Sequence, residues 1–465
     1  MGTLVMKFGG VSVATTTALT QVISIVLQEK ERWQRLIVVA SALEGVTDAL
    51  IEAARLAQLS NQRGYRRIVA TIRTRHLALV EQLPLSADER NALNADIDQL
   101  LFEMLDVCQA LSDALEDRFL TEKMDAIIGV GERLSARIIA ALLRENDLRG
   151  VAIESMNLLV TDDIFGNATP DIQATRARVE RDLLPMLERD IIPVITGFVG
   201  GTVSGKPTTV GRGGSDYTAS VLAACAGADE VWMWTSVDGM MSADPGDVEA
   251  ARVIPAMSYE EVAELAYFGA RILHARMVQP LRDYGIPLRI KNVFKPQQTG
   301  TFVHHSAAGD QIKAVTSIGG LGLRTAEPTT LTAISKLVNR VFTEVIGTSA
   351  DVMLSAQSSS ATFLSVIVPT SAGLDATRSL QSALRHALKQ HPEVGAWTVE
   401  PISVITAVAA GINRQPRLLS RLFFALDDAP LLAVAQGPSH CSLSVVVARD
   451  DADAALQRIH QHIIG

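Results

Sequence analysis

The sequence lacks the features that mark several large classes of protein. Its 465 residues include only three cysteines, Cys108, Cys225 and Cys441, with no Cys-x-x-Cys or Cys/His spacing. That excludes a disulfide framework and gives no sign of a zinc site. No apolar stretch reaches 18 residues, and residues 1–13 lack the basic-then-apolar pattern of a signal peptide. We therefore expect no membrane association and a location in the reducing cytoplasm.

An excess of positive charge is also missing. Lysine and arginine number 42 against 51 aspartates and glutamates, so the net charge is −9. This balance argues against a nucleic acid or an anionic membrane surface as partner, and any anionic ligand must be met by local positive groups. With 48% hydrophobic and 20% charged residues the composition is that of a globular protein, and the length predicts two or three domains.

The most informative stretch is Val210-Gly-Arg-Gly-Gly-Ser-Asp216, which lies between an apolar run at 191–195 and an Ala-rich segment at 217–226 that we expect to be helical. Glycines let the backbone approach an anion closely, and a helix start offers free N–H groups to it. Arg212 can form a two-pronged contact with a carboxylate or a phosphate. Asp216 beside phosphates indicates a metal or proton role. The alternative is a tight turn in which Ser215 or Asp216 merely caps the helix.

Two other strand-to-helix turns favour the anion site. Lys7 ends the apolar run 3–8, and Gly9 and Gly10 follow it before an expected helix. The ammonium of Lys7 could neutralise phosphate oxygens, or Lys7 could be a surface lysine beside a turn. A second apolar run, 36–40, leads into the hydroxyl-bearing loop Ser41–Thr47. Strands alternating with helices favour a parallel sheet that binds ligands at the carboxyl ends of its strands.

Three further stretches carry polar groups at element boundaries. Glu132 follows Gly129-Val-Gly131 in a region that is helical over 48–145, where its carboxylate either complements a helix dipole or binds an ammonium group. Gly200–Lys206 is similar to a phosphate-binding P-loop, but Pro207 follows where Ser or Thr is needed, so we interpret it as a hairpin turn. The polar loop 235–245 could hold a nucleotide base and ribose, or be an ordinary turn.

Simpler elements follow that loop. We expect one helix over 259–281, in which His274 caps or packs and is not a base. A strand over 287–293 and a linker over 295–308 come next.

A repeat occupies the last third of the chain. Ala356-Gln-Ser-Ser-Ser360 and the apolar run 364–368 are echoed by Ala435-Gln-Gly-Pro-Ser439 and the run 443–447. Each copy has an amphipathic helix upstream, so we expect two small β-α-β modules with antiparallel sheets. Their Gln-containing loops either bind the carboxylate of an amino acid, or the modules serve only dimerisation.

Together the motifs resemble those of the aspartokinases, in that family's order. They are Lys7-Phe-Gly-Gly10, Ser41–Thr47, Gly131–Ser135, Gly211–Asp216, Thr235–Pro245 and Phe268–His274. The repeat resembles that family's paired ACT domains. The resemblance implies an α/β fold of the amino acid kinase type, with a mainly parallel sheet flanked by helices. It places the catalytic domain at 1–300 and two ferredoxin-like ACT modules at 311–390 and 391–465.

The resemblance also implies an activity. The family transfers a phosphoryl group from Mg-ATP to the side-chain carboxylate of L-aspartate and makes 4-phospho-L-aspartate, the first step toward lysine, threonine and methionine. Lys7 and Asp216 would be catalytic, Arg212 would bind the substrate α-carboxylate and Glu132 its α-ammonium group. Ser41, Thr47 and Ser215 would line the substrate pocket. The nucleotide would contact Lys7, Phe8, Gly9, Gly10, Thr235, Ser236, Asp238, Ser242, Ala243 and Arg271.

The same resemblance implies regulation and assembly. Lysine or threonine would act as an effector at Gln357, Ser358 and Gln436, and the ACT modules would form a homodimer or a larger assembly. Mg²⁺ would arrive with ATP, and no residue is assigned as a metal ligand of the protein itself.

Several residues depart from the family pattern. Val11, Ser236 and Gly246 stand where threonine, aspartate and arginine are usual, which removes groups that could contact ATP. Arg271 replaces a lysine and keeps its charge with a different geometry. Ala361 and His440 replace glutamates of the two ACT repeats, which bears on the identity of the effector.

Three other functions stay open. The altered nucleotide loop suits a non-catalytic amino-acid sensor or regulatory subunit. A kinase for another substrate is a weaker alternative, because Arg212 and Glu132 match both ends of an α-amino acid. The chain could also be one half of a bifunctional enzyme, since aspartokinases occur fused to homoserine dehydrogenase.

Overall fold

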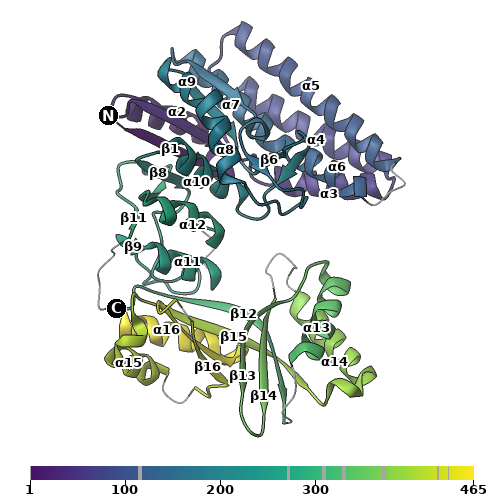
Figure 1. Ribbon diagram of the computed structural model, residues 1–465, viewed down its shortest axis with the longest axis vertical. Coiled ribbons are helices and arrows are strands. Elements are labelled where there is room, and N and C mark those ends of the chain that lie inside the picture. Colours follow the sequence, from purple (N-terminus) through teal and green to yellow (C-terminus); the bar gives the residue numbers. More distant parts are fainter. Residues whose placement is uncertain are drawn as a thin grey trace. The chain divides into compact units, whose positions relative to one another are not determined.

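The computed structural model describes residues 2–113, 118–269, 273–305, 311–326, 331–368, 373, 375–426, 429–437 and 439–464. The chain forms two compact units (Figure 1). Unit 1 comprises residues 1–240, 255–259 and 272–306, and unit 2 comprises residues 241–254, 260–271 and 307–465.

Unit 1 is built on an eight-stranded sheet with the strand order β3-β5-β2-β1-β8-β10-β11-β9. The strands are β1 (Thr3–Phe8), β2 (Arg35–Ala40), β3 (Gly150–Ile153), β5 (Ile192–Thr196), β8 (Glu230–Thr235), β9 (Ala256–Ser258), β10 (Leu288–Asn292) and β11 (Thr301–His304). The six strands β3, β5, β2, β1, β8 and β10 run parallel to one another, whereas β11 runs antiparallel to β10 and is joined by β9 in its own direction. The prediction of a mainly parallel α/β sheet is confirmed.

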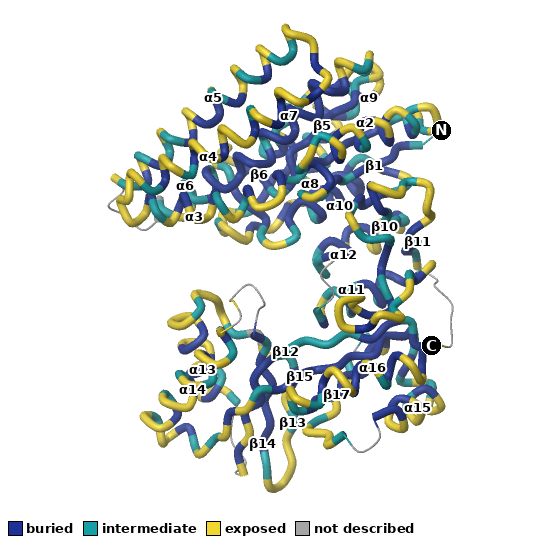
Figure 2. The backbone as a smooth tube through the Cα atoms, turned by 180° about the vertical axis from the view of Figure 1, so that it is seen from behind, coloured by how far each residue is buried: buried dark blue, intermediate teal, exposed yellow. Residues whose placement is uncertain are grey.

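Helices cover both faces of this sheet. Leu4, Met6 and Phe8 belong to the core that also contains α2 (Thr16–Lys30) and α7 (Val130–Glu145). Because side chains alternate along a strand, Lys7 points to the opposite face, toward α10 (Gly214–Ala226). The central strands are buried almost throughout (Figure 2), as strands covered on both faces must be.

A helical bundle extends this core. It consists of α3 (Val46–Gln58), α4 (Gln62–Glu81), α5 (Ala87–Ser112) and α6 (Arg118–Ile128) (Figure 1). Ser86 caps α5, since its Oγ accepts the N–H of Glu89 at 3.4 Å. The Glu89 carboxylate does not return the bond as in a full capping box, because it pairs with Arg144 at 2.7 Å.

Smaller elements complete unit 1. Gly200–Lys206 lies in the hairpin of β6 (Val199–Thr202) and β7 (Pro207–Thr209), which confirms the predicted turn. Together with β4 (Val160–Thr161) these strands form a three-stranded sheet. The short helices are α1 (Gly10–Val13), α8 (Ile172–Arg178) and α9 (Leu184–Glu188).

Two expectations for residues 259–308 were wrong. The expected single helix is α11 (Tyr259–Tyr267) and α12 (Ala275–Tyr284), because Gly269 at φ 107° ends the first and His274 caps the second. The expected linker contains β11, in which Thr301 and Val303 are buried and Phe302 and His304 are partly exposed. That alternation is a strand signal too short to stand out between the polar residues around it.

Unit 2 contains one six-stranded sheet in the order β13-β14-β12-β15-β17-β16, antiparallel throughout. Its strands are β12 (Ala314–Thr325), β13 (Asp351–Gln357), β14 (Thr362–Ile367), β15 (Thr398–Val408), β16 (Ala433–Gln436) and β17 (Ser442–Ala448). Its helices are α13 (Leu331–Ile346), α14 (Ala376–Gln390), α15 (Pro416–Leu426) and α16 (Ala452–Ile463). The two sequence repeats form the β13–β14 and β16–β17 hairpins.

Strands β12 and β15 serve both repeats. They pair with each other from Ala314 opposite Val408 to Arg324 opposite Thr398. Leu321 and Leu323 of β12 pack with α13 and α14, whereas Val315, nearer the start of the same strand, packs with α15 and α16. The repeats are therefore two halves of one sheet that share their long central strands.

His76 of α4 is fully buried, and its Nε2 has no hydrogen-bond partner among the residues that the structure describes. Burial lowers the pKa of His76 to about 4. Below pH 6.5, His76 is protonated in the unfolded chain but stays neutral in the folded chain. The free energy of unfolding therefore falls as pH drops toward 4. We predict that His76→Leu loses less thermal stability between pH 7 and pH 5 than the wild type, in unfolding scans. Equal losses would contradict this, and exposed His386→Leu is the control.

None of the helices in the described ranges combines the length and apolar character needed to cross a membrane.

Candidate active site

The carboxyl ends of three central strands bring the predicted loops together. Phe8 at the end of β1 lies opposite Ala40 of β2 and Trp234 of β8. The N–H of Gly9 donates to the Trp234 carbonyl at 3.2 Å, and the N–H of Ser41 donates to the Phe8 carbonyl at 3.1 Å. The glycine turn, the 41–47 loop and the 235–245 loop therefore start from one edge of the sheet, where parallel α/β sheets bind ligands.

The Gly9–Gly10 turn is tightly packed at its second glycine. A Cβ on Gly10 would lie 3.0 Å from the carbonyl oxygen of Ala42 and 3.3 Å from the backbone nitrogen of Glu44. The N–H of Glu44 also donates to the Gly10 carbonyl at 3.3 Å. This close approach fixes the turn against the 41–47 loop, so the backbone of both is pre-positioned for a ligand.

Lys7 and Asp216 form an ion pair at this edge. Lys7 Nζ lies 2.5 Å from Asp216 Oδ1, and the two side chains are only 13% and 11% exposed. Asp216 stands in the first turn of α10, whose N-cap is Gly213 in the left-handed region at φ 69°. The alternative in which Ser215 or Asp216 caps the helix is therefore wrong, and the Asp216 carboxylate is directed at the lysine.

Glu132 is a buried carboxylate in the first turn of α7. It is 3% exposed, and its Oε2 has no hydrogen-bond partner among the described residues. Burial raises the pKa of Glu132 to about 8, although backbone hydrogen bonds at Ala42 and the charge of Lys7 act in the opposite direction. A buried, unsatisfied carboxylate is costly unless a ligand completes it, and a cation is the partner that would do so.

Arg212 lies exposed on the turn before α10. The turn packs against the start of α12, because a Cβ on Gly213 would lie only 2.3 Å from the Cβ of His274. His274 caps α12 through its Nδ1, which accepts the N–H of Arg276 at 3.4 Å. Burial and the charges of Arg276 and Arg212 lower the pKa of His274. The prediction that His274 caps or packs is confirmed.

The remaining predicted substrate residues line the same edge. Ser41 and Thr47 are half-buried, Thr47 in the first turn of α3 and Ser41 directly after β2. Ser215 is buried against Gly197, where a Cβ would lie 2.5 Å from the Ser215 Cβ. Ser41 is thus hydrogen-bonded to the strand that bears Lys7, and Ser215 directly precedes Asp216.

The first part of the predicted nucleotide loop is held by β10 and the turn after it. The Asn292 amide donates to Asp238 Oδ1 at 2.6 Å and to the Ser236 carbonyl at 3.0 Å. Lys295 Nζ lies 2.8 Å from Asp238 Oδ2. Hydrogen bonds from Lys295 and Asn292 lower the pKa of Asp238. Asp238 therefore shapes the loop, whereas Thr235 and Ser236 are the residues at the strand end.

The second part of that loop belongs to unit 2. Ser242 is 1% exposed, its Oγ lies 2.8 Å from His460 Nε2, and it accepts the N–H of Arg252 at 2.9 Å. Ala243 is buried in the core with α15 and α16. The Ser242 hydroxyl is thus engaged within unit 2, and the nucleotide contacts of Ser242 and Ala243 stay predictions. Arg271 lies outside the described residues.

Three residues near the Arg212 turn escaped the sequence analysis: Asp125, Asn167 and Arg276. Arg276 Nη1 donates to Asn167 Oδ1 at 2.6 Å and to the Val210 carbonyl at 3.4 Å. Its guanidinium lies 5.1 Å from the centre of the Tyr217 ring. The one sequence signal that could have identified Arg276 is its place two residues after the His274 cap.

The predicted effector residues lie on the hairpins of unit 2. Gln357 ends β13 and Gln436 ends β16, and both are exposed. Ser358 closes the first hairpin turn, because its N–H donates to the Ala361 carbonyl at 2.8 Å. The two glutamines therefore occupy equivalent places on the two edge strands of the sheet.

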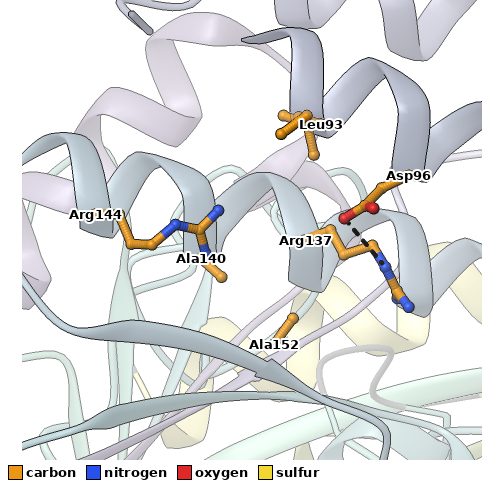
Figure 3. Close-up of a pocket in the computed structure, with 7 residues that line it drawn as sticks. Leu93, Asp96, Arg137, Ala140, Arg144 and Ala152 are labelled. Carbon is orange, nitrogen blue, oxygen red and sulfur yellow. Dashed lines mark ion pairs between the residues drawn. The ribbon is translucent and has the colours of Figure 1, made fainter. Parts of the chain in front are cut away.

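A cavity of about 260 Å³ lies elsewhere in unit 1, between α5, α7 and β3 (Figure 3). Its cations are already matched: Arg137 is 3.9 Å from Asp96 and 3.0 Å from Glu154, and Arg144 is 2.7 Å from Glu89. Paired guanidinium groups of this kind stabilise the α5–α7 packing and leave no charge for an anionic ligand.

No three His, Cys, Asp or Glu side chains gather at a possible metal site in the part of the chain that the structure describes.

Comparison with known sequences agrees with this geometry. The sequence pattern of the amino acid kinase family matches residues 2–292, and that of an ACT domain matches residues 405–463. Lysine-sensitive aspartokinase 3 of Escherichia coli K12 is 30% identical, with 99% of each chain covered. A chloroplastic bifunctional aspartokinase/homoserine dehydrogenase of Arabidopsis thaliana is 30% identical over 98% of this chain and 50% of its own. The chain spans about half the length of the bifunctional relatives that it matches.

Comparison with solved structures gives the same answer. The E. coli aspartokinase III structure in complex with aspartate and ADP matches with a TM-score of 0.79 and 26% identity, covering 99% of this chain and 100% of that one. The predicted fold class is thereby confirmed, including its ACT region. By sequence and by fold, the chain belongs to the amino acid kinase family and, within it, to the aspartokinases.

Proposed function

We propose that this chain is an aspartate kinase that transfers the γ-phosphoryl group of ATP to the side-chain carboxylate of L-aspartate. A carboxylate oxygen forms the new bond to phosphorus, the bond from that phosphorus to the β,γ-bridging oxygen breaks, and ADP leaves with the electron pair. The product, 4-phospho-L-aspartate, opens the route to lysine, threonine and methionine. The Lys7–Asp216 ion pair at the sheet edge, with its 2.5 Å separation, is the observation that carries the proposal.

The reaction asks for alignment and charge neutralisation. The attacking carboxylate is already ionised at neutral pH, so no general base is needed. Lys7, held by Asp216, neutralises charge on the transferring phosphoryl group, and the N–H of Gly10 contacts its oxygens, because the N–H of Gly9 is already bonded to the Trp234 carbonyl. Because the turn is packed against the 41–47 loop, these donors need no rearrangement during the reaction.

Two groups of opposite charge recognise the amino acid. Arg212 binds the α-carboxylate with its forked guanidinium, and Glu132 binds the α-ammonium group. The unpartnered Oε2 of Glu132 supports this role, since a bound ammonium group supplies the missing cation. Ser41, Thr47 and Ser215 line the pocket between them.

ATP occupies the part of the edge next to β8. We assign Phe8, Thr235, Ser236 and Asp238 to nucleotide binding, and the contacts expected of Ser242, Ala243 and Arg271 stay predictions. Thr235 and Ser236 are favoured by their place directly after the strand. Mg²⁺ commonly keeps several waters and is held largely by substrate phosphates, so it would arrive with ATP, and no residue of the chain is assigned as its ligand.

Unit 2 supplies regulation in this proposal. Residues 1–300 form the catalytic domain, and 311–390 and 391–465 form paired ACT modules that associate as a homodimer or a larger assembly. Lysine or threonine binds at Gln357, Ser358 and Gln436. The exposure of both glutamines supports an effector role, and the lysine sensitivity of the E. coli relative favours lysine. The location is the cytoplasm, in keeping with three free, buried cysteines.

The test is formation of aspartate hydroxamate from aspartate, Mg-ATP and hydroxylamine. Activity that depends on both substrates is the expected result, and a folded but inactive chain would refute the proposal. Calorimetry separates the sensor alternative, because a sensor binds an amino acid in unit 2 without measurable ATP binding. The sensor alternative is motivated by Ser236 and Gly246, which stand where the family usually has residues that could contact ATP.

A further inference from the structure

Asp125, near the end of α6, is a buried carboxylate with no part in the proposed reaction. It is 2% exposed. Its Oδ2 accepts the N–H of Gly166 at 2.8 Å and the N–H of Thr209 at 2.7 Å, and its Oδ1 accepts the Thr209 hydroxyl at 2.9 Å. Three donors from two separate segments thus converge on one side chain, which is more than a helix of the outer bundle needs for its own stability.

One of these segments leads into the turn that bears Arg212, and the other contacts it. Thr209 ends β7 and is followed by Val210 and Gly211, while Gly166 is followed by Asn167. Asn167 contacts the turn itself, because a Cβ on Gly211 would lie 2.6 Å from its Oδ1. The N–H of Ala168 donates to the Thr209 carbonyl at 2.9 Å, so the segments are also joined to each other. The carboxylate of Asp125 therefore fixes the entry to the Arg212 turn.

The backbone of the same residue reaches toward the other end of the substrate site. The carbonyl of Asp125 accepts the N–H of Gly129 at 3.0 Å. Gly129 is the N-cap of α7, and Glu132 stands in the first turn of that helix. Arg212 and Glu132 come from segments far apart in the sequence. Asp125 is hydrogen-bonded to a residue shortly before each of them, Thr209 before Arg212 and Gly129 before Glu132.

We propose that Asp125 is a positioning residue that sets the separation of Arg212 and Glu132, and with it the affinity for an α-amino acid. The proposal rests on the function proposed above. An amino acid presents its carboxylate and ammonium group at a fixed separation, so a shift of about 1 Å in one of the two protein groups weakens binding strongly.

The pattern of donors predicts which substitutions are tolerated. Asparagine keeps one oxygen for the two N–H groups and turns its amide toward the Thr209 oxygen, which can accept as well as donate. Burial raises the pKa of Asp125, while the hydrogen bonds from Gly166 and Thr209 act in the opposite direction. Alanine leaves the N–H of Thr209 buried without an acceptor, and it removes the contact that ties exposed Gly166 to the same point, so the two segments must move.

The experiment compares Asp125→Ala and Asp125→Asn in the full chain. Asp125→Ala is expected to raise KM for aspartate at least about tenfold with little change in KM for ATP, and Asp125→Asn is expected to restore most of the loss. An aspartate KM that stays at the wild-type value in a folded Asp125→Ala overturns the proposal. So does an equal rise in the KM of both substrates, which is the mark of general loosening.

Two neighbouring threonines provide a matched pair should Asp125→Ala fail to fold. Thr209→Val removes the hydroxyl that donates to Asp125. Thr208→Val removes a buried hydroxyl of the same strand that bonds to Thr161 at 2.7 Å instead. Both are expected to lower the melting temperature alike, but only Thr209→Val raises KM for aspartate. Equal KM values in the two variants contradict the role of Asp125.

The outcome separates the two proposals. Wild-type activity together with an unaffected Asp125→Ala overturns the role of Asp125 alone. A wild type that phosphorylates no aspartate overturns the proposed function, and calorimetric binding of aspartate to the same variants then decides the role of Asp125.

Discussion

Replacing Lys7 with alanine is expected to lower kcat for aspartate phosphorylation about a thousandfold, because a preorganised cation at the transferring phosphoryl group is lost. The Lys7 ammonium lies 2.5 Å from Asp216, and the Lys7 side chain is 13% exposed. Its position is set by the same strand register that fixes Gly9. Charge that develops in the transition state is stabilised far better there than in water. KM for aspartate should change much less, since Arg212 and Glu132 hold the substrate's other end.

Hydroxamate assays at saturating substrate measure this effect. Lys30→Ala is the matched control, because Lys30 also pairs with an aspartate, Asp190, in unit 1 but on its surface. Asp216→Asn should reproduce much of the Lys7 defect, since it removes the charge that orients the ammonium. A folded Lys7→Ala with turnover within tenfold of the wild type is incompatible with the role given to Lys7.

Replacing Glu132 with glutamine is expected to raise KM for aspartate about 100-fold with a much smaller change in kcat, because the α-ammonium group loses its buried counter-charge. Glutamine preserves the size of the side chain, so packing is retained. Glu103→Gln is the control: Glu103 pairs at 3.5 Å with Arg133, the residue next to Glu132, without being buried. An unchanged aspartate KM in Glu132→Gln would refute the role.

The pH dependence provides a second measurement on Glu132. Its pKa is about 8 in the free protein, and only the ionised form attracts an ammonium group. Aspartate affinity should therefore fall about tenfold per unit as pH drops below 8, with a proton released on binding at neutral pH. Calorimetry in buffers of different ionisation enthalpy detects that proton. Glu132→Gln should abolish both effects.

Stability should follow the opposite trend for this group. A carboxyl whose pKa is raised by folding binds its proton more tightly in the folded chain, so its stabilising contribution is complete below pH 4.5 and is lost as pH rises through about 8. Glu132→Gln should flatten that part of the stability curve. Thermal scans between pH 6 and pH 9 without substrate measure it.

The sequence predicted the placement of residues where a strand, a glycine turn and a charged residue follow one another. Lys7, Gly10 and Asp216 could be expected to lie close together because each marks a boundary between elements, and parallel strands bring such boundaries to one edge. Their roles in a reaction stay predictions. The family resemblance added Glu132, whose carboxylate alone could equally complement a helix dipole. Burial made the difference visible, because a surface carboxylate needs no partner and a buried one does.

Other features depended on contacts between distant segments. Asp125 lies in a helical stretch, where a charged residue is usually exposed to solvent. Its role depends on hydrogen bonds from Gly166 and Thr209, which are distant in the sequence. Ser242 lies within the predicted nucleotide loop yet packs beside His460, more than 200 residues away. The break between α11 and α12 depends on Gly269 adopting φ 107°, which a helical pattern on either side conceals.

The shared strands of unit 2 make its two repeats inseparable. A cut after Gln390 would strip β12 of β15, its partner along Ala314–Arg324, and would open the cores under both helix pairs at once. Neither half can then be transferred to another protein on its own, although the sequence shows them as copies. A graft meant to change the response of one hairpin must include the whole sheet. Because all six strands are joined by backbone hydrogen bonds, a distortion at one edge strand can be transmitted to the other edge strand.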